Sequence, residues 1–226
     1  MLTRSVHDKL GHVASRQRLD DPVSREAGTY RERVYPPLVT LGLFVEQVIH
    51  SDQACQDVVG RALSQRTALG LKDCSLNTGP YCKARQRLGL GLLQGMAREI
   101  AAHAEQAGDT AWRWRGRSVK LIDGTTVSMP DTTENQAAFP QNHEQAPGLG
   151  FPVARVVGVI SLLSGCVLDW TVSACEGEGT SELMQLRQLL KGLSRGDVVI
   201  GDRGYCSYFL LAMLRTKPSF PSSLLD

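Results

Sequence analysis

The stretch "VKLIDGTTVSMPDT", residues 119–132, decides the fold of this chain. Its apolar start, with Leu121 and Ile122, predicts a β-strand, and a carboxylate, Asp123, stands where we expect that strand to end. A purely structural strand needs no charge at this point, whereas a strand that delivers a metal ligand to a cleft does. A metal site at this point would need a second carboxylate that the fold brings to Asp123.

Length and composition are those of a soluble globular protein. The chain has 226 residues, of which 42% are hydrophobic and 21% charged. It contains no apolar run near the roughly 20 residues that a membrane helix needs. The polar N-terminus lacks the apolar centre of a signal peptide, so we expect a cytoplasmic protein.

Charge is unevenly distributed along the chain. Residues 61–120 carry eleven Lys and Arg against four Asp and Glu, whereas residues 121–226 carry seven against eleven. This asymmetry is expected if one part meets a polyanion and another gathers metal-binding carboxylates, although solvated helix faces give a milder version. The six cysteines have no zinc-ligand spacing, and we expect buried, reduced thiols.

The hydrophobic pattern divides the chain into three parts. Residues 1–33 are a polar N-terminal segment. Residues 34–110 predict a helical domain, with helices over 35–50, 52–65 (capped by Ser51), 80–88 and 91–106. Residues 111–226 predict strands over 112–123, 151–163, 166–174 and 197–202, with a helix over 180–193 before the fourth strand and another after it.

This order predicts a mixed α/β sheet in which the fourth strand lies parallel to and beside the first. The first strand would end at Asp123 and the fourth at Asp202. Their carboxylates would then meet at one edge of the sheet, where open α/β sheets bind their ligands. The alternative for each is an aspartate that caps the turn after a strand.

Three segments carry a resemblance to a known family: "LIDGTTVSMPDTTENQAAFPQ" (121–141), "PGLGFPVARVVGV" (147–159) and "GDVVIGDRGYCSYF" (196–209). The chain resembles DDE transposases of bacterial insertion sequences, in the insertion-element-four group, from about Tyr35 to Lys217. The resemblance implies a ribonuclease-H-like catalytic domain, with Asp123 and Asp202 as its first two catalytic and metal-binding aspartates. It also implies a nucleoid-associated bacterial protein.

Transposition would require Mg²⁺, with Mn²⁺ as a substitute, and double-stranded DNA as both element end and target. Self-association is left open. The resemblance and the local charge point to basic candidates for DNA backbone contacts: Lys83, Arg85, Arg87, Arg113, Arg115, Arg117 and Arg203. A solvated basic face is the alternative for the first six, and a surface salt bridge is the alternative for Arg203. We predict that Trp112 and Trp114 are core residues. The second interpretation is that they stack on a splayed base.

The family places its third acid in a Y-x-x-R-x-x-x-E pattern beyond the second aspartate, and these 226 residues contain no such pattern. We therefore expect an incomplete catalytic domain in a truncated copy that does not cleave or join DNA at a useful rate. The alternative function is a non-catalytic DNA-binding or oligomerising fragment that interferes with an intact transposase. Glu182, in the first turn of a predicted helix, is a minor candidate for a carboxylate near the metal.

Overall fold

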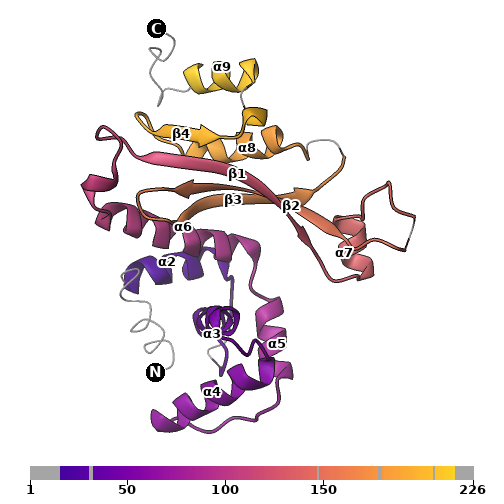
Figure 1. Cartoon of the computed structure of the whole chain (residues 1–226). Coiled ribbons are helices and arrows are strands. Elements are labelled where there is room, and N and C mark those ends of the chain that lie inside the picture. Colours follow the sequence, from indigo (N-terminus) through magenta and orange to yellow (C-terminus); the bar gives the residue numbers. More distant parts are fainter. Residues whose placement is uncertain (1–15, 31–32, 147, 178–179, 206, 217–226) are drawn as a thin grey trace. The chain divides into compact units, whose positions relative to one another are not determined.

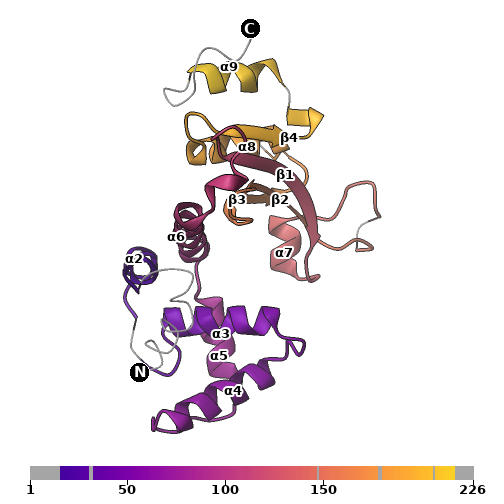
Figure 2. The ribbon, with the colours of Figure 1, turned by 60° about the vertical axis from the view of Figure 1, so that its left-hand side comes forward.

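The structure, a computed structural model, describes residues 16–30, 33–146, 148–177, 180–205 and 207–216. Residues 1–103 form one compact unit, called here the helical unit, and residues 104–226 form the second, called the sheet unit (Figures 1 and 2). The boundaries predicted for the domains stay a prediction, and much of the polar segment 1–33 lies outside the described residues.

The helical unit is built from the predicted amphipathic helices and an earlier one. They are α2 (Arg16–Glu26), α3 (Pro37–Ile49), α4 (Cys55–Ala68), α5 (Gly79–Gln86) and α6 (Leu90–Ala107). Helix α3 starts at a proline, which has no N–H to leave unpaired in a first turn. The prediction that Ser51 caps α4 is wrong: Asp52 accepts the Ala54 N–H at 2.9 Å instead.

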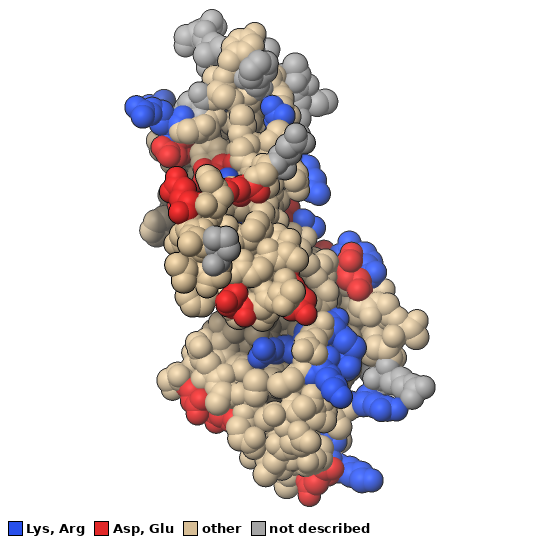
Figure 3. Space-filling view, turned by 90° about the vertical axis from the view of Figure 1, so that its right-hand side faces the viewer, with Lys and Arg blue, Asp and Glu red and all other residues tan. Residues whose placement is uncertain are grey.

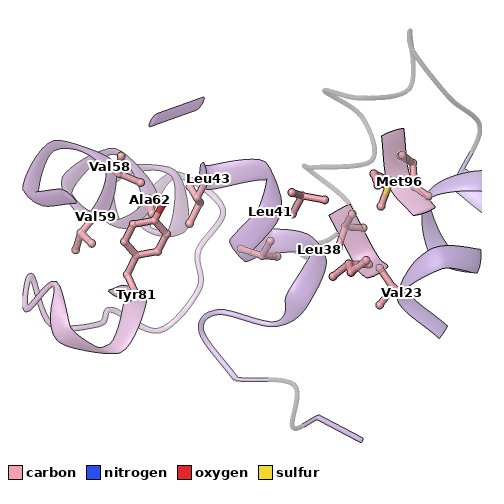
Figure 4. Packing of buried hydrophobic residues seen from close by; sticks show 12 residues of the cluster. Val23, Leu38, Leu41, Leu43, Val58, Val59, Ala62, Tyr81 and Met96 are labelled. Carbon is pink, nitrogen blue, oxygen red and sulfur yellow. The ribbon is translucent and has the colours of Figure 1, made fainter. Parts of the chain in front are cut away.

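The helical unit has its own hydrophobic core. Tyr81 is fully buried, and Figure 4 shows its ring beside Val58, Val59 and Ala62. The Tyr81 hydroxyl donates a hydrogen bond to Gln47 Oε1 at 2.8 Å, so its burial leaves no polar atom unpaired. This core holds α3, α4 and α5 together.

The sheet unit alternates strands and helices in the predicted order. Its elements are the 3₁₀ turn η1 (Thr110–Trp112), β1 (Val119–Ser128), α7 (Thr133–Ala138), β2 (Val153–Ser161), β3 (Val167–Ala174), α8 (Glu182–Leu189), η2 (Leu190–Gly192), β4 (Val198–Gly201), η3 (Arg203–Tyr205) and α9 (Tyr208–Thr216). The four strands form one sheet in the order β3-β2-β1-β4. Strand β2 is antiparallel to β1 and β3, and β4 is parallel to β1. The predicted mixed α/β fold class is confirmed.

One face of the sheet is covered by helix α8 and the turns that follow it (Figure 1). Leu186 and Leu189 of α8 are almost fully buried against Ile122 and Val157. Ser181 caps α8 by accepting the Met184 N–H at 3.4 Å. The helix therefore connects β3 to β4 and lays its first turn on the strand that carries Asp123.

Several local predictions are wrong. Residues 112–118 form no strand, because Arg115 and Gly116 turn the chain back on itself with φ of 50° and 77°. Trp112 and Trp114 are exposed rather than buried in the core. A short, nearly all-apolar strand is usually buried on both faces, yet Ile200 of β4 remains 47% exposed. The five described cysteines are free thiols, as predicted, but only half-buried.

None of the described helices is both long enough and apolar enough to cross a membrane.

Candidate active site

Asp123 lies inside β1 rather than at its end. The strand continues to Ser128, because residues 123–128 keep pairing with β2 through Gly158 to Val153. The apolar part of the strand does stop at Asp123, and the following residues are more exposed. Asp123 therefore sits where β1 leaves the core and is no longer paired on the β4 side.

Asp202 is brought to the same position by the parallel pairing of β4. The last pair in the register joins Ile122 to Gly201, so Asp123 and Asp202 are each the next residue along their strands. Both side chains are exposed. The prediction that β4 lies parallel to and beside β1 is confirmed. This pairing brings together two aspartates that are far apart in the sequence.

Glu182 reaches the same region from the first turn of α8. A Cβ atom placed on Gly124 would lie 3.1 Å from the Glu182 carboxylate and 3.2 Å from the Tyr205 hydroxyl. The glycine after Asp123 thus leaves room for both side chains to approach β1. The sequence pattern predicted only a minor role for Glu182 and did not single out Tyr205. Residue spacing does not show that either side chain packs near Gly124.

Tyr205 is the centre of this arrangement. Its side chain is 5% exposed, and its hydroxyl lies beside the Glu182 carboxylate, since a Cβ atom on Gly124 would be within 3.2 Å of both groups. Burial first, then the negative charge of Glu182 and a hydrogen bond with its side chain, and then the charges of Asp123 and Asp202 raise the pKa of Tyr205 above its ordinary value. Three carboxylates therefore lie near enough to act on one buried hydroxyl, which stays protonated.

Two arginines border these carboxylates. Arg155, on β2, places its Nε 4.0 Å from Glu182 Oε1 and donates a hydrogen bond from Nη1 to the Thr180 carbonyl at 2.8 Å. Arg155 thus holds the start of α8 in place. Arg203 follows Asp202 in η3 and is exposed. Figure 3 shows acidic side chains gathered on one face of the sheet unit.

Other acids serve different purposes. Asp169 is 5% exposed and belongs to the interior of the sheet unit. The exposed carboxylate of Glu176 has its Oε2 2.6 Å from Nδ1 of His143. Asp197 accepts the Ser194 N–H at 2.8 Å, in the turn before β4.

The basic candidates of the helical unit differ in exposure. Lys83 and Arg87 are exposed, line a cavity of about 760 Å³ and make no ion pair within the described part of the chain. Arg85 is half-buried: it donates a hydrogen bond to Gln47 Oε1 at 2.9 Å and stacks on Phe44 at 5.2 Å. This geometry favours a structural role for Arg85. Basic side chains gather on the face of the helical unit shown in Figure 3.

The remaining basic candidates, Arg113, Arg115 and Arg117, lie on the exposed turn before β1. Trp114 and Arg117 exchange both backbone hydrogen bonds at 3.0 Å, which closes a two-residue hairpin. Positive φ at both central residues is the type I′ geometry. Arg115 is an unusual residue for it, because the left-handed region costs a residue with a Cβ about 1–2 kcal/mol.

Comparison with known proteins identifies the family of the sheet unit. Residues 114–221 match the family model of the transposase DDE domain. This part of the chain is a transposase DDE domain. Over 130 residues the chain is 32% identical to the transposase InsG for insertion sequence element IS4 of Escherichia coli (strain K12). That alignment covers 57% of this chain and 28% of the relative's length, so the chain spans little more than a quarter of the relative it matches.

The predicted family, DDE transposases of the insertion-element-four group, is confirmed by these matches. The transposase DDE domain is ribonuclease-H-like, and the mixed sheet with β4 beside β1 agrees with that fold. The family implies dependence on a divalent metal and action on DNA.

The donor chemistry of the DDE domain fits such a metal. Asp123 and Asp202 supply exposed carboxylate oxygens, the hard ligands that Mg²⁺ takes in ones or twos while it keeps several waters. Among the described residues, no group of three or more His, Cys, Asp or Glu side chains is arranged to hold a metal ion. Within the described residues, the candidate metal ligands are therefore the two aspartates, Asp123 and Asp202.

Proposed function

We propose that this chain carries two of the catalytic acids of a DNA transposase that cleaves phosphodiester bonds at insertion-sequence ends and joins them to target DNA. The observation that supports this most is the parallel pairing of β1 with β4, which ends at Ile122 and Gly201. Asp123 and Asp202 follow directly, on a domain whose family is known for this chemistry.

Asp123 and Asp202 would hold the divalent cation, Mg²⁺ or Mn²⁺. When bound, it stabilises negative charge that develops on phosphate oxygens. Arg203, next to Asp202 and exposed, would add a positive charge for the same phosphate. The basic residues Lys83, Arg87, Arg113, Arg115 and Arg117 would contact the DNA backbone and set its position. Arg85, which is hydrogen-bonded to Gln47, would instead stabilise the helical unit.

We expect no useful rate of cleavage from these 226 residues alone. The third acid of the family pattern does not occur among them, and positioning supplies most of the catalysis in phosphoryl transfer. A misplaced cation lowers that rate by orders of magnitude. Glu182, near Gly124 and Tyr205, is the first residue to suspect if cleavage is nevertheless observed.

A second function is binding to DNA without cleavage, in competition with an intact transposase. The observation that favours it is the exposure of Lys83 and Arg87, which have no carboxylate partner among the described residues. Such binding needs neither aspartate. Association between copies of the chain would strengthen the competition.

The deciding experiment incubates the purified chain with Mg²⁺ or Mn²⁺ and labelled DNA that carries insertion-sequence ends. We expect DNA binding with little or no cleavage. Calorimetric titration with Mn²⁺ should show a weak site that is lost in Asp123→Asn and Asp202→Asn. The matched control is Glu144→Gln, another exposed acid of the sheet unit. Equal Mn²⁺ binding by all four proteins would overturn the metal assignment, and efficient cleavage that needs Asp123 would overturn the inactivity.

A further inference from the structure

The turn before β1 presents an unusual combination of side chains to solvent. Trp112 is 71% exposed and Trp114 is 54% exposed. The six residues 112–117 also carry three arginines and no acid. Large aromatic side chains are normally buried, so two indoles in solvent on one short turn call for a partner.

The turn is held in this shape from both sides. Asp109 accepts the Ala111 N–H at 2.9 Å and so fixes η1. Trp114 and Arg117 close the hairpin with two backbone hydrogen bonds, and Arg115 accepts a left-handed φ of 50° at its tip. The Arg115 guanidinium lies 5.0 Å from the centre of the Trp114 ring. The aromatic and cationic groups are therefore preorganised next to each other.

We propose that this turn, residues 112–117, binds unpaired nucleotides of DNA, with bases stacked on Trp112 and Trp114 and phosphates held by Arg113, Arg115 and Arg117. The inference rests on the proposed action on DNA and adds the class of DNA that the turn recognises. A duplex hides the faces of its bases, so an indole can stack only on a base that has left the helix.

Charge complementarity favours DNA over other occupants. In the described part of the chain, no carboxylate forms an ion pair with Arg113, Arg115 or Arg117, so all three guanidinium groups are available to an anionic partner. Alternating aromatic and cationic groups are what sequence-tolerant single-strand binding uses: every base has a face to stack, and every linkage has a phosphate. A protein that breaks DNA strands has use for such a site, since nucleotides beside a break can leave the stack.

The test uses the full chain carrying Trp170→Phe, so that only the two turn tryptophans fluoresce. We expect a single-stranded oligothymidylate of about 15 nucleotides to quench this fluorescence. A duplex of the same length should bind with little quenching. In the wild-type chain, Trp112→Ala/Trp114→Ala should weaken single-strand binding about tenfold and leave its salt dependence unchanged. Trp112→Phe/Trp114→Phe should retain most of the affinity.

Removing the charges should have a different signature. Arg113→Gln/Arg115→Gln/Arg117→Gln should lower the slope of log K against log salt by about 0.7 for each phosphate that the protein no longer neutralises. Two controls should match wild type: Phe151→Ala, an exposed aromatic residue, and Arg187→Gln/Lys191→Gln/Arg195→Gln, which removes three other exposed charges. Circular dichroism and thermal unfolding confirm that each variant folds.

The outcomes separate this inference from the proposed function. Equal single-strand binding by wild type and Trp112→Ala/Trp114→Ala would overturn the stacking site and leave duplex binding standing. If the turn binds anionic phosphatidylserine vesicles and not the oligonucleotide, its ligand is a lipid surface, and the proposed stacking site is overturned as well. A wild-type chain that binds neither single-stranded nor duplex DNA at low salt would overturn both.

Discussion

Single residues decide how closely the carboxylates of the sheet unit can gather. Gly124 leaves open the space into which Glu182 and Tyr205 reach, and a side chain there would lie within 3.2 Å of both. The Tyr205 hydroxyl is then buried beside the Glu182 carboxylate, with the charges of Asp123 and Asp202 also acting on its pKa. A buried hydroxyl beside a carboxylate can donate a hydrogen bond to it, and this bond would hold Glu182 against β1.

Tyr205→Phe tests this explanation. Because the change removes a buried hydroxyl that lies beside the Glu182 carboxylate, we expect the free energy of unfolding to fall by about 1 kcal/mol. Tyr81→Phe is the matched comparison: its buried hydroxyl is hydrogen-bonded to Gln47, and its loss should also cost about 1 kcal/mol. Urea denaturation measures both variants. Unchanged stability in Tyr205→Phe beside a loss in Tyr81→Phe would contradict the contact with Glu182.

The pair of Glu105 and Lys120 predicts a pH dependence. Burial by itself would raise the pKa of Glu105, but hydrogen bonds from Lys120 and nearby serines outweigh it and lower the pKa below its usual 4.5. A lowered folded-state pKa means that the stabilisation is present above about pH 4.5 and is lost as the pH falls through the folded value. The stability of the sheet unit should therefore decrease in this acidic range.

Glu105→Gln should cost about 3 kcal/mol at pH 7, because it leaves the 4% exposed Lys120 without its counter-charge. The variant should also lose part of the decrease in stability below pH 4.5. Glu176→Gln breaks an exposed pair with His143 and should cost under about 1 kcal/mol. Urea denaturation at pH 7 and in acid compares the proteins, and an equal effect of the two substitutions would refute the role of the buried pair.

At the scale of elements, α8 both covers the sheet and delivers Glu182. Its inward face contributes Leu186, which is fully buried, while Met184 on the same helix is 40% exposed. Leu186→Ala should therefore cost about 2–5 kcal/mol, because apolar burial decreases and a cavity is left behind, and Met184→Ala should cost well under about 1 kcal/mol. Chemical denaturation followed by circular dichroism makes the comparison. Similar destabilisation of both variants would mean that α8 does not pack on the sheet as described.

Most helices and strands were predicted from the hydrophobic pattern and from the order of segments along the chain. Two strand-like segments joined by a turn, 151–163 and 166–174, predicted β2 and β3. The helix before a short apolar strand implied that β4 lies beside β1, which brought Asp202 to Asp123. Local turn chemistry was the weak point: "WRWRGR" has the alternation of a strand, but the glycine after Arg115 allows a type I′ turn that exposes both tryptophans. The approach of Glu182 and Tyr205 to Gly124 depends on packing between distant elements, which no spacing in the sequence encodes.

At the scale of the whole molecule, charge divides between the two units. Basic residues concentrate between 61 and 120, and acids concentrate after 120, where the aspartates lie. A polyanion is attracted by the first set, and cations are attracted by the second. Binding of DNA and binding of a metal should therefore be separable by substitution.

The last prediction concerns this separation. The chain should bind duplex DNA weakly, with an affinity that falls steeply as salt rises, since basic side chains release counterions from the phosphates. Lys83→Gln/Arg87→Gln should lower the slope of log K against log salt by about 0.9 for each phosphate that is left without a cationic side chain. Arg25→Gln/Arg98→Gln removes two other cations of the helical unit, one of them 3.4 Å from Glu99, and should change the slope little. Fluorescence anisotropy of a labelled duplex at several salt concentrations measures each slope. Binding that is unchanged between low and physiological salt, or equal slopes for both double variants, would show that these residues do not meet the DNA. Because neither pair of substitutions touches Asp123 or Asp202, Mn²⁺ binding should be unaltered in both.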